Sequence, residues 1–299
     1  MPVIGFFNAA SPAGYTPYVA AFRDGLKEGG YIDGQNVRIE FHWAEGHYER
    51  LPEMAATLGQ SDVSVIVANT PANLAAKKAT EVIPIVFTTA SDPVAIGLVP
   101  NLSHPGGNVT GVSQLNESLG PKRLEMAHEL LPAATVIGLL VNPSDTGRSE
   151  RLIKEVHAAA VHLGLSLKIL RAGTEAEIEA AFAGFAQLKA GPLVIGADAF
   201  YNAKSRLLAE LSLRYAVPAI YEYREFTDAG GLLSLSGNLK ESYRWAGIYT
   251  GRILKGAKPA DLPVQQSTTV ELIVNLKSAK ALGVTVPQSL LGRADEIIE

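Results

Sequence analysis

The chain contains no cysteine, no excess of basic residues and no long hydrophobic run. Without cysteine it cannot form a disulfide, a thiolate metal site or a thiol nucleophile. Its 26 lysines and arginines face 30 aspartates and glutamates, for a net charge of −4. This balance argues against nucleic acid as a partner, because phosphates are met by clustered basic side chains. The apolar runs are the length of strands, well short of the ~20 residues of a membrane helix.

The fingerprints of the common nucleotide-binding and hydrolytic enzymes are also missing. No Gly-x-Gly-x-x-Gly follows a predicted strand, no phosphate loop ends in Gly-Lys-Ser/Thr, and no Gly-x-Ser-x-Gly elbow occurs. The stretch His42–His47 holds two histidines and a glutamate. Its first residues end a predicted strand, where alternate side chains point to opposite faces. We therefore expect no enzyme activity, no cofactor and no metal site.

Two long stretches of the chain follow the same plan. The apolar run Val3–Asn8 reappears as Val136–Asn142, 133 residues later, and Val82–Phe87 reappears as Ala216–Tyr221, 134 residues later. Predicted helices lie between these runs in the same order. A copy of this length is a whole domain, much longer than a solenoid unit of roughly 20–50 residues. A chain of 299 residues also suits two domains.

Strands and helices alternate along both copies, which implies parallel sheets with helices on both faces. We therefore predict the α/β class, with two Rossmann-like lobes and a ligand cleft between them. The elements after residue 231 cannot all belong to the nearer lobe, so we expect three crossings, near Ser113, Ser236 and Pro263. Lobe 1 is then residues 1–114 plus 236–262, and lobe 2 is residues 115–235 plus 263–299. The predicted strands are 3–7, 37–43, 63–67, 84–88, 109–112, 136–141, 166–170, 193–195, 219–221, 231–235 and 270–275, and the predicted helices are 18–27, 48–58, 71–80, 149–163, 175–188, 203–215, 241–255 and 276–282.

Small polar residues follow several predicted strands, where ligands of open parallel sheets bind. Thr70-Pro71 and Asp92-Pro93 each look like an N-cap followed by proline at the first helical position, whose free N–H groups accept an anion. Acidic residues at strand ends could neutralise an ammonium group, and aromatic ones could stack on a flat ligand. The same residues also serve as ordinary caps and packing groups. The candidate ligand-binding residues are Asn8, Ser11, Tyr15, Asn69, Thr70, Pro71, Ala72, Ser91, Asp92, Asn142, Ser144, Asp198, Phe200, Tyr221 and Glu222.

Five runs of sequence carry a family resemblance: Asn69–Ala72, Ser91–Val94, Pro105–Val112, Arg252–Pro263 and Asn275–Gly283. Together they resemble the ABC-transporter substrate-binding proteins related to tryptophan- and tyrosine-binding components. The resemblance covers nearly the whole chain and implies a type I periplasmic binding fold. It also implies export by a signal peptide that this sequence lacks, a periplasmic or other extracytoplasmic location, and delivery of a solute to a membrane permease.

The resemblance further implies where the ligand binds. The first-lobe motif corresponds to Thr70–Ala72 with Ser91-Asp92, and the second-lobe acidic position corresponds to Asp198. The chain departs from the family at Tyr221–Phe226, where relatives carry smaller residues, and at Phe200-Tyr201.

The sequence therefore predicts a monomeric solute-binding component of an ABC importer. It is expected to capture a small carboxylate-bearing ligand, an aromatic amino acid or an aromatic acid, by hinge closure. Two alternatives stay open. A cytosolic effector-binding domain of a transcription regulator shares the fold but normally carries a DNA-binding helix-turn-helix. A Rossmann-type enzyme would need a cofactor loop or a nucleophile.

Overall fold

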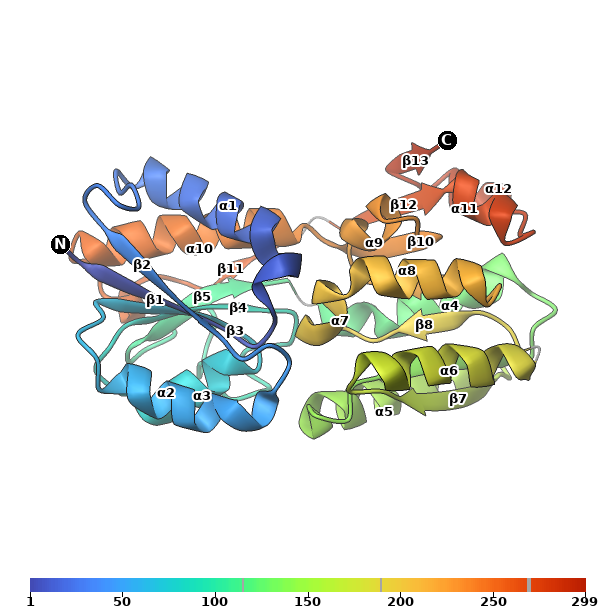
Figure 1. The fold of residues 1–299 in the computed structure, drawn as a ribbon, viewed down its shortest axis with the longest axis horizontal. Helices are drawn as coiled ribbons and strands as arrows, with labels where there is room; N and C mark the ends of the chain where they lie inside the picture. Colours follow the sequence, from blue (N-terminus) through green and yellow to red (C-terminus); the bar gives the residue numbers. More distant parts are fainter. Residues whose placement is uncertain (115, 189, 268–269) are drawn as a thin grey trace. The chain divides into compact units, whose positions relative to one another are not determined.

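The computed structural model describes residues 1–114, 116–188, 190–267 and 270–299. The chain divides into two compact units (Figure 1). Unit 1 comprises Met1–Leu115 and Asn238–Thr268, and unit 2 comprises Asn116–Gly237 and Thr269–Glu299. The chain therefore passes from one unit to the other three times.

Unit 1 is built on a six-stranded sheet in the order β11-β5-β4-β3-β1-β2, in which the pairs are parallel. Strands β3, β4 and β5 are buried along their whole length and β1 nearly so. Central strands of a parallel sheet are covered on both faces, which explains their continuous apolar sequences. The strands are β1 (Val3–Asn8), β2 (Arg38–Trp43), β3 (Val65–Asn69), β4 (Ile85–Thr89), β5 (Val109–Ser113) and β11 (Gln265–Gln266).

Two helices far apart in the sequence pack closely in unit 1. Helices α1 (Pro12–Glu28) and α10 (Leu239–Leu254) lie side by side (Figure 1). A Cβ atom on Gly25 of α1 would lie 1.9 Å from a backbone oxygen of α10, and one on Gly247 of α10 would lie 2.1 Å from a backbone oxygen of α1. Only glycine permits this approach. The remaining helices of the unit are η1 (Tyr48–Arg50), α2 (Leu51–Gly59), α3 (Ala72–Ala79) and η3 (Pro259–Asp261).

Unit 2 contains a seven-stranded sheet in the order β13-β12-β10-β9-β8-β6-β7. The predicted α/β class with parallel sheets is confirmed, with one antiparallel pair, β10 and β12. Strand β12 enters after a passage from unit 1 and not through a crossover helix, so its direction is not constrained by such a helix. The strands are β6 (Val136–Val141), β7 (Ser166–Arg171), β8 (Leu193–Ile195), β9 (Ala219–Tyr221), β10 (Leu233–Gly237), β12 (Val270–Asn275) and β13 (Glu296–Ile298).

The helices of unit 2 differ from prediction at several places. Helix α4 (Gly120–Leu130) was not predicted, although Leu124, Ala127 and Leu130 recur at helical spacing and are buried in the core of the unit. The predicted helix 203–215 corresponds to α8 (Ser205–Arg214), and a separate short helix, α7 (Ala199–Ala203), precedes it, because the backbone of Lys204 leaves the helical region between them. The other helices are η2 (Asn116–Leu119), α5 (Thr146–His162), α6 (Glu175–Gln187), α7 (Ala199–Ala203), α8 (Ser205–Arg214), α9 (Arg224–Asp228), α11 (Leu276–Ala281) and α12 (Gln288–Leu291).

Candidate functional site

The carboxyl edge of the unit-1 sheet ends in amide side chains. Asn8 is the last residue of β1 and Asn69 the last residue of β3. Asn69 Oδ1 accepts the Ala9 N–H at 2.9 Å, and Asn69 Nδ2 lies 3.4 Å from the hydroxyl of Tyr15, to which it donates. Asn8 Nδ2 donates to the hydroxyl of Tyr243 on α10 at 3.2 Å. The structure thus brings Asn8, Asn69 and Tyr15 together, and the close packing of α1 on α10 holds Tyr243 beside them.

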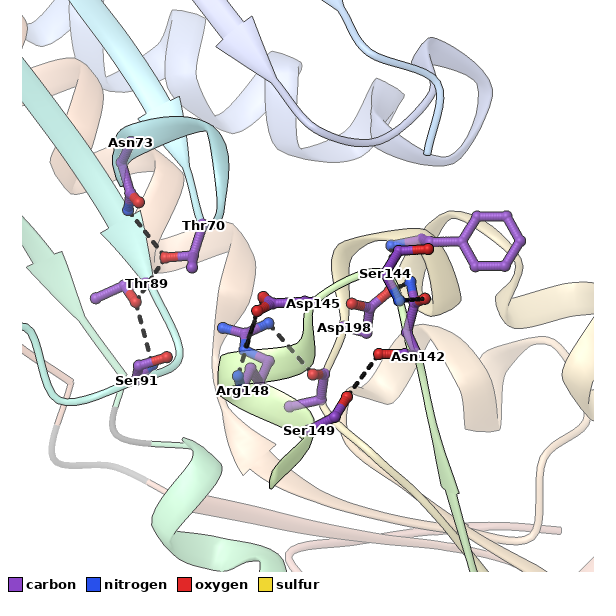
Figure 2. Close-up of polar contacts among 12 residues, drawn as sticks. Thr70, Asn73, Thr89, Ser91, Asn142, Ser144, Asp145, Arg148, Ser149 and Asp198 are labelled. Atoms are coloured by element: carbon purple, nitrogen blue, oxygen red, sulfur yellow. Dashed lines mark hydrogen bonds and ion pairs between the residues drawn. The ribbon is translucent and has the colours of Figure 1, made fainter. Parts of the chain in front are cut away.

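Hydroxyl groups extend this edge along the next strand (Figure 2). Thr70 Oγ1 donates to Thr89 Oγ1 at 2.8 Å and accepts from Asn73 Nδ2 at 2.9 Å. The Ser91 N–H donates to Thr89 Oγ1 at 3.1 Å. Thr70, Asn73, Thr89 and Ser91 are all buried, so this small network fixes the loop that leads into α3.

The helix start predicted at Thr70-Pro71 lies one residue later than expected. Pro71 occupies the N-cap of α3 and Ala72 is the first helical residue. The side chain of Pro71 has no donor or acceptor, so the N-cap makes no side-chain hydrogen bond, and the neighbouring Thr70 hydroxyl donates to Thr89. The N–H groups of Leu74 and Ala75 donate to the Pro71 oxygen at 3.1 and 3.4 Å, so the N–H groups at the helix start that lack an intrahelical acceptor are those of Ala72 and Asn73.

The helix start predicted at Asp92-Pro93 is wrong. Asp92 Oδ1 accepts the Val94 N–H at 2.8 Å and the Ala95 N–H at 3.3 Å, as a cap would. The segment nevertheless forms only a hydrogen-bonded turn, which ends at Gly97 with a φ of 73°. This left-handed conformation suits glycine and does not continue a helix. The exposed Asp92 therefore caps a turn.

The carboxyl edge of the unit-2 sheet carries a second polar group (Figure 2). Asn142 follows β6 and donates through Nδ2 to Asp198 Oδ1 at 3.0 Å. Asn142 Oδ1 accepts the Ser144 N–H at 2.9 Å. Asp198 is also the N-cap of α7, where its Oδ1 accepts the N–H groups of Phe200 and Tyr201 at 2.9 and 3.4 Å. The structure therefore brings together Asn142, Ser144, Asp198 and Phe200.

Two buried arginines in unit 2 were missed by sequence analysis. Arg148, on the first turn of α5, donates through Nη1 to the Ala197 oxygen at 3.2 Å, and its Nε lies 4.0 Å from Asp145 Oδ2. Arg123, near the start of α4, is 1% exposed. Charged residues on a helix normally indicate a solvated face. For Arg148 the available signal was its position three residues after the capping Asp145, which points it back over the helix start.

Glu222 follows β9 and is 1% exposed. Its Oε1 accepts from Asn116 Nδ2 at 3.3 Å. Burial raises the pKa of the Glu222 carboxyl, and the nearby guanidinium groups of Arg123 and Arg148 oppose that rise. This edge of unit 2 therefore carries two buried acidic side chains, Asp198 and Glu222, and the two buried arginines.

The predicted aromatic residues have different surroundings. Tyr221 is fully buried, its hydroxyl donates to the Leu208 oxygen of α8 at 3.3 Å, and its ring stacks on Phe226 at 4.9 Å. Its side chain therefore belongs to the core of unit 2. Phe200, in contrast, stands on the first turn of α7 beside the Asp198 cap. In unit 1, the N-cap residue Ser11 is partly buried and makes no side-chain cap bond.

Other features fall outside these edges. A surface cavity of about 400 Å³ lies between α1 and α10. Its lining includes Glu28 and Gly29 at the end of α1, and α1 runs back from the carboxyl edge of the sheet. Among the residues that the structure describes, no cluster of histidine, aspartate and glutamate could hold a metal ion. Within the same residues, no helix is long and apolar enough to cross a membrane.

Comparisons with known proteins agree on one family. The profile described as ABC transporter substrate binding protein matches residues 10–298. A curated tyrosine-binding protein of Clostridioides difficile is 28% identical over 262 residues, which cover 87% of this chain and 75% of the relative. The structure of an ABC domain from Streptococcus pneumoniae in complex with L-Trp is 29% identical, with a TM-score of 0.86 and 99% of each chain covered. A conserved domain protein from Vibrio cholerae is 26% identical, with a TM-score of 0.88 and 99% of each chain covered. The predicted type I periplasmic binding fold is thus confirmed.

Proposed function

Because the chain belongs to the ABC transporter substrate binding protein family, we propose that it captures an aromatic amino acid and delivers it to a membrane permease, outside the cytoplasmic membrane. Two relatives support this ligand class, since one is named for tyrosine and another was solved with L-Trp. The first of these is a binding protein by name, and we further propose that this chain binds its ligand without transforming it and acts as a monomer.

The observation that carries the proposal is the different chemistry of the two sheet edges. The edge of unit 1 offers hydroxyl groups and the start of α3, whereas the edge of unit 2 offers the Asp198 carboxylate. An amino acid is a zwitterion, so its carboxylate needs hydrogen-bond donors and its ammonium group needs a negatively charged acceptor. We assign the ligand carboxylate to Thr70–Ala72 with Ser91, where the helix dipole contributes roughly 0.3–1 kcal/mol. We assign the ligand ammonium to Asp198.

The side chain of the ligand also has candidate partners. Tyr15 in unit 1 lies edge-to-face on Trp43, with ring centroids 5.9 Å apart, and Phe200 in unit 2 adjoins the Asp198 cap. Aromatic rings prefer such edge-to-face or offset contacts. We propose that Tyr15 and Phe200 contact the ligand ring. A ligand held by both units would shift the protein toward the closed state that it binds better.

A set of matched compounds tests these assignments by calorimetric titration. L-tyrosine is compared with tyramine, which lacks the carboxylate, and with 3-(4-hydroxyphenyl)propanoate, which lacks the ammonium. Each loss should weaken binding by roughly ten- to a hundredfold, since hydrogen bonds to charged groups contribute about 1.5–3 kcal/mol. At 100 times Kd the amino acid should stabilise the protein by ~2.7 kcal/mol in thermal unfolding. A neutral sugar serves as control, and strong stabilisation by the sugar without any by aromatic amino acids would refute the proposal.

A further inference from the structure

A buried charged network lies where the chain enters and leaves unit 2. Asn116 is the first residue of this unit, and Gly237 is the last before the chain passes to unit 1. Arg123 stands near the start of α4, and Glu222 follows β9. The side chains of Asn116, Arg123 and Glu222 are each at most 1% exposed. Residues separated by up to 121 positions thus share one enclosed site.

The Asn116 amide group connects Glu222 to the exit of unit 2. Its Nδ2 donates to Glu222 Oε1 at 3.3 Å, and its Oδ1 accepts the Gly237 N–H at 2.9 Å. The carboxylate therefore selects one orientation of the amide, because a flipped Asn116 would point its oxygen at Glu222 and its NH₂ at the Gly237 N–H. The charge of Glu222 is in this way linked to the last residue of β10.

Arg123 reaches the same two segments from the other side. Its Nη1 donates to the Asn116 backbone oxygen at 3.2 Å, and its Nε donates to the Leu235 oxygen of β10 at 3.0 Å. The segment at Asn116, where the chain enters unit 2, and strand β10, from which it leaves, are therefore both bound by the Arg123 guanidinium group. Glu222 is the acidic group whose charge acts on that guanidinium.

Stability alone does not account for this arrangement. A buried ion pair often contributes no more than a well-packed apolar pair of the same volume, and a cation near a helix start is opposed by the helix dipole. What the network does supply is geometry, since four hydrogen bonds converge on Asn116, Gly237 and Leu235. Buried polar groups that are hydrogen-bonded to one another in this way favour one local arrangement.

We propose that Arg123 and Asn116 are positioning residues, held in place by the Glu222 carboxylate, that fix the two segments through which the chain enters and leaves unit 2 and thereby tune ligand affinity. Glu222 acts on affinity without touching the ligand. The link to affinity rests on the solute-binding function proposed above, whereas the local geometry does not.

Amide hydrogen exchange of the full chain without ligand tests the geometry. In Glu222→Met, which removes the acceptor and the charge, the Gly237 amide should exchange roughly tenfold faster, the effect of losing one buried hydrogen bond. In Glu222→Gln, which keeps a neutral acceptor, it should exchange about threefold faster, because charge-assisted bonds are the stronger ones. Asn116→Ala removes the acceptor of the Gly237 N–H itself and serves as the positive control. The central β6 amide of Leu139 reports that each variant is folded.

Asp228→Asn is the matched control, because Asp228 pairs with Arg224 on α9 at the surface. It should leave the exchange of Gly237 unchanged. If Gly237 is as protected in both Glu222 variants as in the wild type, the carboxylate does not hold the network and the proposal fails. This result does not depend on which solute the protein binds.

Titration with two probes tests the effect on affinity. Glu222→Gln should lower the affinities for L-tyrosine and for 3-(4-hydroxyphenyl)propanoate by the same factor, roughly three- to tenfold. A positioning residue does not touch the ligand and therefore does not distinguish the two compounds. If the variant binds L-tyrosine more weakly but binds the compound without an ammonium group as the wild type does, Glu222 contacts the ligand and the proposal is overturned. If the wild type binds neither probe, the proposed function fails, and the exchange data alone decide the positioning role.

Discussion

Replacing Asp198 by asparagine separates its two roles, as a cap of α7 and as the proposed partner of the ligand ammonium. In the wild type, Asp198 Oδ1 accepts from Asn142 Nδ2 and from the N–H groups of Phe200 and Tyr201. Asparagine keeps an oxygen at this position and is as good an N-cap as aspartate. It lacks only the negative charge. The fold should therefore remain, and the affinity for an amino acid should fall.

The magnitudes follow from these contacts. Asp198→Asn should change the free energy of unfolding by less than ~1 kcal/mol, because an acceptor remains for each donor. Asp198→Ala should cost about 2–4 kcal/mol, with ~1 from the lost cap and about 1–3 from leaving the buried Asn142 amide without its acceptor. Both variants should bind L-tyrosine roughly ten- to a hundredfold more weakly, the effect of losing a contact of about 1.5–3 kcal/mol.

Urea denaturation and calorimetric titration measure the two effects on the same samples. Asp145→Asn is the control, since Asp145 caps α5 through the Arg148 N–H and is not assigned to the ligand. It should bind L-tyrosine as the wild type does. If Asp198→Asn also binds normally while Asp198→Ala unfolds much earlier, Asp198 is a structural cap, and the ammonium assignment is refuted.

Three further outcomes are expected. Gly25→Ala should destabilise the protein by about 1–3 kcal/mol in urea denaturation, because its Cβ would meet the Arg244 oxygen. Gly184→Ala in α6 is the control: it has open space around the new Cβ and should stabilise the protein by ~0.5–1 kcal/mol. Equal effects at both positions would contradict the close packing of α1 on α10. Leu193→Ala in the buried β8 should cost about 2–5 kcal/mol through a cavity, with ligand affinity unchanged by titration. Because burial raises the pKa of Glu222, the stability of the wild type relative to Glu222→Gln should fall as the pH rises from the ordinary glutamate pKa through the raised one. Urea denaturation at several pH values measures this difference, and a relative stability that grows with pH would contradict the raised pKa.

The buried strands were the most predictable elements. Val3–Asn8 and Val270–Asn275 are largely apolar runs, and both strands form within a residue of the predicted limits. Burial on two faces leaves such a run little choice of structure. Helix α4 and the short helix α7 escaped prediction, because the first has many charged residues and the second has only five residues, too few for a periodic pattern.

The strand-end amides and hydroxyls of the candidate site could also be predicted, because parallel topology places the carboxyl ends on one edge. The partners of these residues could not. Asp92 and Asp198 look alike in sequence, yet one caps an exposed turn and the other accepts from the buried Asn142. Arg123 resembles a solvated helix residue until the fold brings β10 to it. Pairings across 56 or 112 residues carry no local signal.

The close approach of α1 and α10 has a consequence for the order in which the chain folds. Helix α1, with its contact residue Gly25, is made early in synthesis. Its partner α10 is complete only when Leu254 has been added. The whole segment Asn116–Gly237 of unit 2 emerges from the ribosome in between. Since domains fold as units during synthesis, unit 1 must wait for a partner helix made after most of unit 2. During this interval the face of α1 that carries Tyr18 and Phe22 lacks its cover. Unit 2 is in turn completed only by Thr269–Glu299, so neither unit is complete until most of the other has been made.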